Sequence, residues 1–273
     1  MQRRCCALSL YHFSHPFAVL NRATIARRIS DKSCRKAMLS HWRKKYITDL
    51  LPVQCEVCGL RVVGDQKLSW LCEHCLAYFT PQPRCQRCGL PTVSDVLECG
   101  LCLTSPPLWS KLYCVGDYQA PLSHYVHQLK YERQFWVAEK LAELFVPTVS
   151  DPAPLITSVP LHWRRHGYRG FNQSELLAMA IARQLKVMYS PLFKRVRATS
   201  PQQGKNRQQR MANLHQVFTL KGGVAAKRVA IVDDVLTTGS TVHHLCKLLL
   251  DAGVESVDIY TICRTPEPAD KSD

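Results

Sequence analysis

"VAIVDDVLTTGST", residues 229–241, joins an apolar run to two adjacent carboxylates and then to a turn rich in hydroxyl groups. The apolar part, residues 227–232, is short and β-branched, which is typical of a buried strand. The pattern after the turn predicts a helix over residues 240–251, with Gly253 as its C′ residue. The stretch therefore predicts a strand, a tight turn and a helix in direct succession.

The chain around this stretch repeats the alternation of strand and helix. Strands are predicted over 111–119, 155–161 and 254–263, and a helix over 172–186. Asn172 and Glu175 stand at capping-box spacing at the start of that helix. Residues 121–146 predict a helix pair or one interrupted helix. Strands that alternate with helices indicate an α/β fold with a parallel sheet and flanking helices.

The residue types of the motif indicate what it can bind. Ligands of parallel α/β sheets bind beyond the carboxyl ends of the strands, where Asp233 and Asp234 are expected. The N–H groups of a helix N-terminus favour a phosphate, and Gly239 allows close backbone approach. Because carboxylates repel phosphate, the acidic pair must serve another part of the ligand. Two hydroxyls of a ribose fit, and so does Mg²⁺, bound directly or through water.

The cysteines form a second pattern. Of 14 cysteines, eight fall into four CxxC pairs. Two such pairs supply four sulfurs in a tetrahedron, the closed arrangement of structural zinc. Disulfides are the alternative, but a chain without a secretory signal is expected in a reducing compartment, which disfavours them. Consecutive pairing is the simplest scheme and an interleaved scheme stays open. The predicted ligands of the two zinc ions are Cys55, Cys58, Cys72 and Cys75, and Cys85, Cys88, Cys99 and Cys102.

The net charge of +15 is concentrated at the N-terminal end. Residues 1–45 hold eleven Lys or Arg and one acid, so about two thirds of the excess lies there. Residues 1–37 are interpreted as a disordered basic extension or a mis-assigned start before Met38, with a transit peptide as a further alternative. No apolar run is long enough for a membrane span, so a cytoplasmic location is expected.

"VAIVDDVLTTGST" resembles the 5-phosphoribosyl 1-diphosphate (PRPP) binding motif of type I phosphoribosyltransferases. The resemblance implies that Asp233 and Asp234 hold the ribose hydroxyls and act in catalysis, and that PRPP binds together with Mg²⁺. It further implies that the turn holds the 5-phosphate. The implied PRPP-binding residues are Asp233, Asp234, Val235, Thr237, Thr238, Gly239, Ser240 and Thr241.

The cysteine pairs, "VPLHWRRHGYRGFNQSELLA" and the spacing of Gln203, Arg210, Asn213 and Phe218 extend the likeness to the ComF/GntX family. This family is linked to DNA uptake, competence and the use of DNA as a nutrient. The resemblance implies a double zinc-ribbon module over 38–107, a phosphoribosyltransferase-like domain over 108–265 with a hood segment over 111–150, and a tail over 266–273. The implied contacts to pyrophosphate, directly or from a mobile loop, are Arg164, Arg165, Arg169, Lys130 and Arg210.

Two hypotheses on function follow. The first is transfer of phosphoribose from PRPP to an acceptor, for which a nucleobase is the candidate and no recognition residue is visible. The second is a non-catalytic protein that binds single-stranded DNA through its zinc ribbons and basic loops and uses the fold as a PRPP or nucleotide sensor. Either protein has the DNA-uptake machinery as a candidate partner. Positioning and electrostatics dominate the transfer chemistry, so no nucleophilic triad is expected.

Overall fold

The structure, a computed structural model, describes residues 53–62, 68–161, 170–196 and 217–265. The chain divides into two units, Met1–Val53 and Gln54–Asp273, and almost everything described belongs to the second. The segments predicted as a basic extension and as a tail lie outside the described residues.

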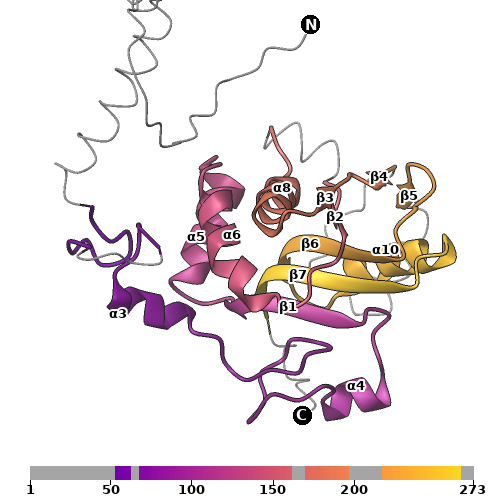
Figure 1. Ribbon diagram of the computed structural model, residues 1–273, viewed down its shortest axis with the longest axis horizontal. Coiled ribbons are helices and arrows are strands. Elements are labelled where there is room, and N and C mark those ends of the chain that lie inside the picture. Colours follow the sequence, from indigo (N-terminus) through magenta and orange to yellow (C-terminus); the bar gives the residue numbers. More distant parts are fainter. Residues whose placement is uncertain (1–52, 63–67, 162–169, 197–216, 266–273) are drawn as a thin grey trace, which may run out of the picture. The chain divides into compact units, whose positions relative to one another are not determined.

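The second unit is built on a five-stranded sheet in the order β1-β7-β6-β2-β3 (Figure 1). All four strand pairs in it are parallel, which confirms the predicted α/β fold. A separate antiparallel pair is formed by β4 and β5. The strands are β1 (Lys111–Asp117), β2 (Leu155–Ser158), β3 (Met188–Tyr189), β4 (Phe193–Arg195), β5 (Phe218–Leu220), β6 (Arg228–Leu236) and β7 (Ser256–Arg264).

Helices cover both faces of the sheet. Helices α5, α6 and α8 lie on one face and α10 on the other (Figure 1). The alternation of side chains along β6 explains this layering, because Ala230 and Val232 pack into one apolar cluster and Val229 and Ile231 into another. The helices are α3 (Glu73–Leu76), α4 (Gly100–Thr104), α5 (Leu122–Tyr131), α6 (Val137–Phe145), α8 (Gln173–Leu185) and α10 (Ser240–Asp251), with the short 3₁₀ turns η1 (Ala77–Phe79) and η2 (Val146–Thr148).

The strand of the opening motif is longer than predicted. It continues past Val232 to Leu236, because β7 remains a hydrogen-bonding partner as far as Arg264. The neighbour on its other side, β2, ends at Ser158, opposite Val232. Beyond that point β6 is paired with a described strand on one side only.

The predicted capping box at α8 is wrong. Asn172 is the N-cap residue, but its side chain makes no capping hydrogen bond. Its amide donates instead to the Val159 carbonyl at 3.1 Å, and so ties the helix start to the chain beyond β2. The segment 121–146 forms two helices, α5 and α6, which confirms the first of the two alternatives.

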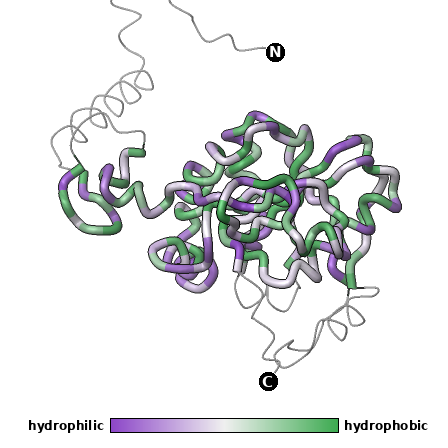
Figure 2. Tube along the Cα trace, turned by 90° about the horizontal axis from the view of Figure 1, so that it is seen from below, coloured by the Kyte–Doolittle hydropathy of each residue, from purple (hydrophilic) through white to green (hydrophobic). Residues whose placement is uncertain are grey.

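Among the helices that the structure describes, none has the length and the apolar run needed to cross a bilayer. Hydrophobic and hydrophilic residues are interspersed along the described trace (Figure 2).

Candidate functional site

The two carboxylates lie where β6 runs on alone past the end of β2. Asp233 follows Val232, the last residue of β6 that faces β2, and Asp234 comes next. The two carboxylates meet side chains of different helices, Asp233 of α8 and Asp234 of α5. Asp234 is buried, whereas Asp233 keeps part of its surface accessible.

Asp233 is held by α8 and by its own neighbour. Its Oδ1 accepts a hydrogen bond from Ser174 Oγ at 3.0 Å and another from the Asp234 amide at 2.9 Å. Burial of the carboxyl group and the adjacent charge of Asp234 raise the pKa of Asp233 to about 7, although Lys130 and both hydrogen bonds oppose the rise. This carboxyl group therefore changes its charge near neutral pH.

Asp234 pairs with Lys130 from α5. Lys130 Nζ lies 3.0 Å from Asp234 Oδ1, and both side chains are largely buried. Burial on its own would lower the pKa of Lys130, but the charge and hydrogen bond of Asp234 outweigh it, so the pKa is raised and the ammonium is retained. The second oxygen, Oδ2, is buried and has no hydrogen-bond partner among the described residues. A buried acceptor without a donor is costly, so this oxygen is suited to accept a ligand hydroxyl.

The turn after β6 has the geometry of an anion-binding bend. Gly239 has φ +71° and directly precedes α10, which begins at Ser240. Thr238 Oγ1 and Ser240 Oγ lie 2.9 Å apart across this glycine. The free N–H groups of a helix's first turn and its dipole both favour negative charge, and the hydroxyls add donors. Thr237 is exposed, while Val235 and Thr241 are half-buried.

The other predicted pyrophosphate contacts lie outside the described residues: Arg164, Arg165, Arg169 and Arg210, together with Gln203 and Asn213 of the mobile-loop pattern. Lys130 alone of that set is placed, and it contacts Asp234. Phe218 is described as well, and its ring is buried in β5. A cavity of about 350 Å³ opens beyond the end of β2, with Ser158, Asn172 and Lys194 in its wall, but the acidic pair is not part of its lining.

Three residues at or behind the site were not predicted from the sequence. Ser174 donates to Asp233 from the first turn of α8. Trp109 packs against Gly239, and Arg264 donates to the Thr237 carbonyl. The local sequence gives no signal for these contacts. The serine lies inside a helix, the tryptophan follows two prolines and the arginine ends a strand.

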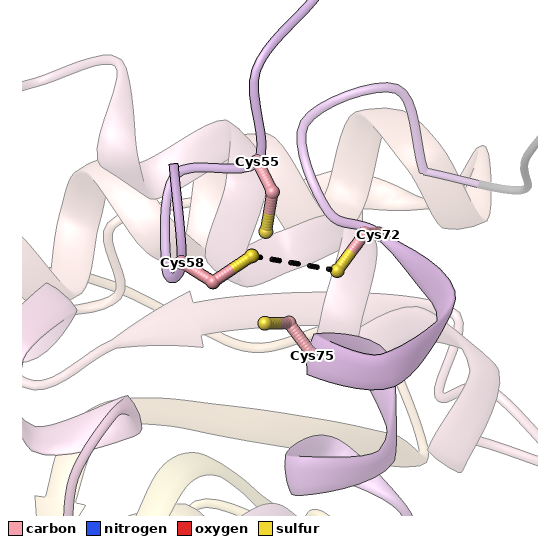
Figure 3. Close-up of side chains that lie close together, drawn as sticks. All are labelled: Cys55, Cys58, Cys72 and Cys75. Carbon is pink, nitrogen blue, oxygen red and sulfur yellow. Dashed lines mark hydrogen bonds between the residues drawn. The ribbon is translucent and has the colours of Figure 1, made fainter. Parts of the chain in front are cut away.

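The CxxC pairs form two candidate metal centres. The four thiols of Cys55, Cys58, Cys72 and Cys75 point toward one another (Figure 3), and those of Cys85, Cys88, Cys99 and Cys102 do the same. This is the consecutive scheme, and the interleaved one is not formed. In each group all sulfurs lie within 4.8 Å of one another.

The donor atoms fit zinc. Four sulfurs about 2.3 Å from one ion stand about 3.8 Å apart at the corners of a tetrahedron. The Sγ atoms of Cys58 and Cys72 are 3.7 Å apart, and those of Cys85 and Cys102 are 3.9 Å apart. A disulfide needs about 2.05 Å, and all described cysteines are free. Both groups can therefore hold a structural zinc ion.

One family model and several characterised proteins are similar to this chain. The family described as "Phosphoribosyl transferase domain" matches residues 172–273, which include the acidic pair and the turn. The DNA utilization protein YhgH of Escherichia coli K12 is 39% identical over 225 residues, covering 79% of this chain and 98% of that protein. Competence protein F of Haemophilus influenzae is 35% identical over 206 residues, covering 71% of this chain and 90% of that protein.

A solved structure of a hypoxanthine phosphoribosyltransferase from Staphylococcus aureus aligns with 52% of this chain and 65% of that chain. Its TM-score is 0.28 and its sequence identity 15%. A likeness this distant carries no argument about activity.

Proposed function

The chain belongs to the family of the DNA utilization protein YhgH and competence protein F, as the ComF/GntX resemblance predicted, and on this premise we propose that it binds PRPP and transfers its phosphoribosyl group. The observation that carries the proposal is the buried Oδ2 of Asp234, which has no hydrogen-bond partner in the described part of the chain, on the strand that leads into the glycine turn at the start of α10. A ribose hydroxyl supplies the missing donor, and the 5-phosphate of the same sugar meets the turn.

In this proposal the two carboxylates bind and orient the sugar. Asp233 and Asp234 accept hydrogen bonds from the 2- and 3-hydroxyls, and their negative charge stabilises the positive charge that builds on the ring as the bond from C1 to pyrophosphate breaks. Lys130 pairs with Oδ1 of Asp234, and among the described residues the second oxygen has no hydrogen-bond partner. Mg²⁺ bound with PRPP would neutralise the departing pyrophosphate. Backbone N–H groups and the hydroxyls of Thr237, Thr238, Ser240 and Thr241 hold the 5-phosphate.

The acceptor is proposed by chemical class only. The names of the relatives connect them with competence and DNA utilization, and a nucleobase released from DNA is an acceptor that the transfer chemistry can use. The arginines predicted to contact pyrophosphate, Arg164, Arg165, Arg169 and Arg210, remain part of this proposal. The same names favour single-stranded DNA as a partner, which is the core of the sensor hypothesis.

We also propose that both four-cysteine groups hold structural zinc, with residues 38–107 as the double zinc ribbon and 108–265 as the transferase-like domain. The sulfur spacings in both groups support this. Eight reduced thiols require a reducing compartment, which agrees with a cytoplasmic location.

The test is calorimetric titration with PRPP in the presence of Mg²⁺. We expect saturable binding to the unmodified protein and at least tenfold weaker binding to Asp234→Asn, which keeps the side-chain shape but removes the charge. Asp251→Asn removes a carboxylate from the exposed end of α10 and should bind PRPP unchanged. Equal affinity of all three proteins would reject the site.

Turnover is tested separately from binding. The protein, PRPP and Mg²⁺ are incubated with a panel of nucleobases, and the release of pyrophosphate is measured. Release that requires one base supports the transferase. Binding of PRPP without release for any base, combined with retention of single-stranded DNA, supports the sensor.

A further inference from the structure

The second four-cysteine group is formed by Cys85, Cys88, Cys99 and Cys102. Backbone carbonyls of its first turn accept hydrogen bonds from the sheet domain. Three successive carbonyl oxygens of the "CQRC" turn accept hydrogen bonds from that domain: Gln86 from the Leu112 amide at 2.8 Å, Arg87 from Trp109 Nε1 at 2.6 Å and Cys88 from Arg264 Nε at 3.0 Å. These carbonyls lie between and at the two sulfur-bearing residues of the turn. Their directions therefore depend on how Cys85 and Cys88 are held.

Arg264 connects the second four-cysteine group with the phosphate turn, which is the turn of residues 237–241 proposed to hold the 5-phosphate. It lies buried at the end of β7, and Nη1 donates to the carbonyls of Leu236, at 3.3 Å, and of Thr237. In a trans peptide the C=O and the following N–H point in opposite directions. Fixing these two carbonyls on the guanidinium therefore directs the N–H groups of Thr237 and Thr238 away from it.

Trp109 makes the second connection. Its indole N–H is bonded to the Arg87 carbonyl, and the far edge of its ring lies against Gly239. The approach is close enough that a Cβ added at Gly239 would stand 2.9 Å from Trp109 Cη2. One buried ring thus contacts the metal-binding turn at one end and the phosphate turn at the other.

The first four-cysteine group has different neighbours. Trp70, next to that group, donates to Glu143 at 2.7 Å and packs on Tyr125, and Glu56 pairs with Lys140. Glu143, Tyr125 and Lys140 belong to α5 and α6. The first group therefore supports the hood helices, whereas the second supports the turn before α10.

We propose that Arg264 and Trp109 are positioning residues that transmit the order of the second four-cysteine group to the phosphate turn, so that affinity for PRPP depends on the metal in this group. The inference rests on the proposed function, because it takes the 237–241 turn as the phosphate site. It assigns unequal roles to two metal centres that look alike in the sequence.

A pair of arginines tests the proposal. Arg84 also joins the second ribbon to the sheet domain, since Nη1 donates to the Gly89 carbonyl and to Asp117 Oδ1, each at 2.9 Å. Within the described residues, neither of these bonds reaches the 237–241 turn. We expect Arg264→Gln to weaken PRPP binding at least tenfold, and Arg84→Gln to stay within threefold of the unmodified protein. Equal affinities in all three proteins, or equal losses in both variants, would overturn the proposal.

Zinc release gives a readout that a purely structural role would not move. Coupling between the binding free energies of two sites is reciprocal, so PRPP must raise the zinc affinity of the second group if zinc strengthens PRPP binding. Equilibrium competition for zinc with a coloured chelator should show two steps, and PRPP should shift only one of them to a higher chelator concentration. That shift should be absent in Arg264→Gln and present in Arg84→Gln. A shift of both steps or of neither would count against the coupling.

A third measurement does not need PRPP. Cys99→Ser disables the second group and Cys58→Ser the first, and hydrogen exchange is followed at the amides of residues 237–241. Exchange there should quicken in Cys99→Ser and not in Cys58→Ser. If exchange quickens in Cys99→Ser and not in Cys58→Ser, while the unmodified protein fails to bind PRPP, the coupling stands and the proposed function is rejected. If exchange is the same in both, the coupling falls whatever the protein binds. Should Cys99→Ser not fold, Trp109→Phe, which loses the bond to Arg87 and the ring edge that contacts Gly239, takes its place.

Discussion

Asp233 and Asp234 are neighbours in the sequence, yet each is held by a different helix. Ser174 of α8 donates to Asp233, and Lys130 of α5 pairs with Asp234. Asp234 thus has a cation at 3.0 Å. Burial and the adjacent carboxylate of Asp234 raise the pKa of Asp233, and the charge of Lys130 only partly offsets the rise.

The raised pKa of Asp233 predicts how stability depends on pH. Its pKa is about 7 in the folded protein, against about 3.9 in an unfolded chain, so the folded state holds this proton more tightly. Its contribution to stability is complete below pH 4 and is lost as pH rises through 7. Asp233→Asn keeps the acceptor for Ser174 and does not ionise. We expect this variant to be more stable than the unmodified protein at pH 8, by roughly 1–3 kcal/mol after allowance for solvent screening.

Urea unfolding from pH 5 to 8, without PRPP or Mg²⁺, measures this difference. The gap between the two proteins should widen with pH. A constant gap, or an unmodified protein that gains stability relative to the variant, would contradict the raised pKa.

The pair of Lys130 and Asp234 leads to a second prediction. Lys130→Met leaves the Asp234 carboxylate buried without its cation, which should cost about 3 kcal/mol of unfolding free energy. Adding Asp234→Asn to that variant removes the uncompensated charge and should recover most of the loss. Urea unfolding of the four proteins of this cycle measures the coupling, and strictly additive losses would show that the two side chains do not interact.

The sequence predicts groups that are contiguous in the chain better than contacts between distant residues. Asp233, Asp234 and the 237–241 turn could be singled out as candidates because carboxylates, hydroxyls and glycine are contiguous there. Ser174 and Arg264 could not, since Ser174 is 59 residues from Asp233 and Arg264 is 176 residues from Cys88. Only the folded sheet brings those pairs together.

At the scale of elements, pairing with β7 determines where β6 ends and the turn begins. Apolar character ends at Val232, but backbone pairing with β7 continues to Leu236 and is indifferent to the side chains. The existence of β1, β2, β6 and β7 followed from local pattern, whereas this end depended on β7 and the short strands β3, β4 and β5 were not predicted. The capping box also depended on a distant contact: Asn172 Nδ2 donates to the Val159 carbonyl, and Asn172 makes no capping hydrogen bond to α8.

Gly239 allows a test of the turn between β6 and α10. An alanine there must adopt φ +71°, which costs about 1 kcal/mol, and its Cβ would press on Trp109, which adds about 1–3 kcal/mol. Gly239→Ala should therefore lower the unfolding free energy clearly and weaken PRPP binding. Gly223→Ala is the matched control, since nothing lies within 4 Å of a Cβ there.

The two parts of that cost can be separated by thermal unfolding in a Trp109→Phe background. The smaller ring removes the crowding and leaves the backbone strain, so Gly239→Ala should cost less there. An undiminished cost in that background would mean that the ring of Trp109 does not press on the turn.

At the scale of the whole molecule, the two ribbons depend differently on the rest of the chain. Cys55, Cys72 and Cys75 lie in the same apolar cluster as α5, α6 and the sheet. Among the described residues, Cys85, Cys88 and Cys102 form a small cluster of their own, joined by Leu90, Val96 and Cys99. The CxxC spacing predicted both metal groups equally well, but it could not predict this difference, which comes from packing against distant helices.

Removal of zinc should therefore disorder the two ribbons to different extents and leave the central strands of the sheet folded. Metal analysis is expected to find two zinc ions per chain, and structural zinc contributes about 10–16 kcal/mol to the folding of isolated zinc-finger peptides. Without it the second ribbon has too small an apolar cluster to stay ordered, while the central strands keep a core that contains no metal ligand, including Val229, Ile231 and Ile259. After chelation, hydrogen exchange should be fast over residues 85–105, intermediate over 54–79 and still slow in β6 and β7. Restoring zinc should restore protection in both ribbons. Loss of protection in β6 and β7 together with the ribbons would mean that metal and sheet fold as one unit, and the separate core assigned here to the sheet would be wrong.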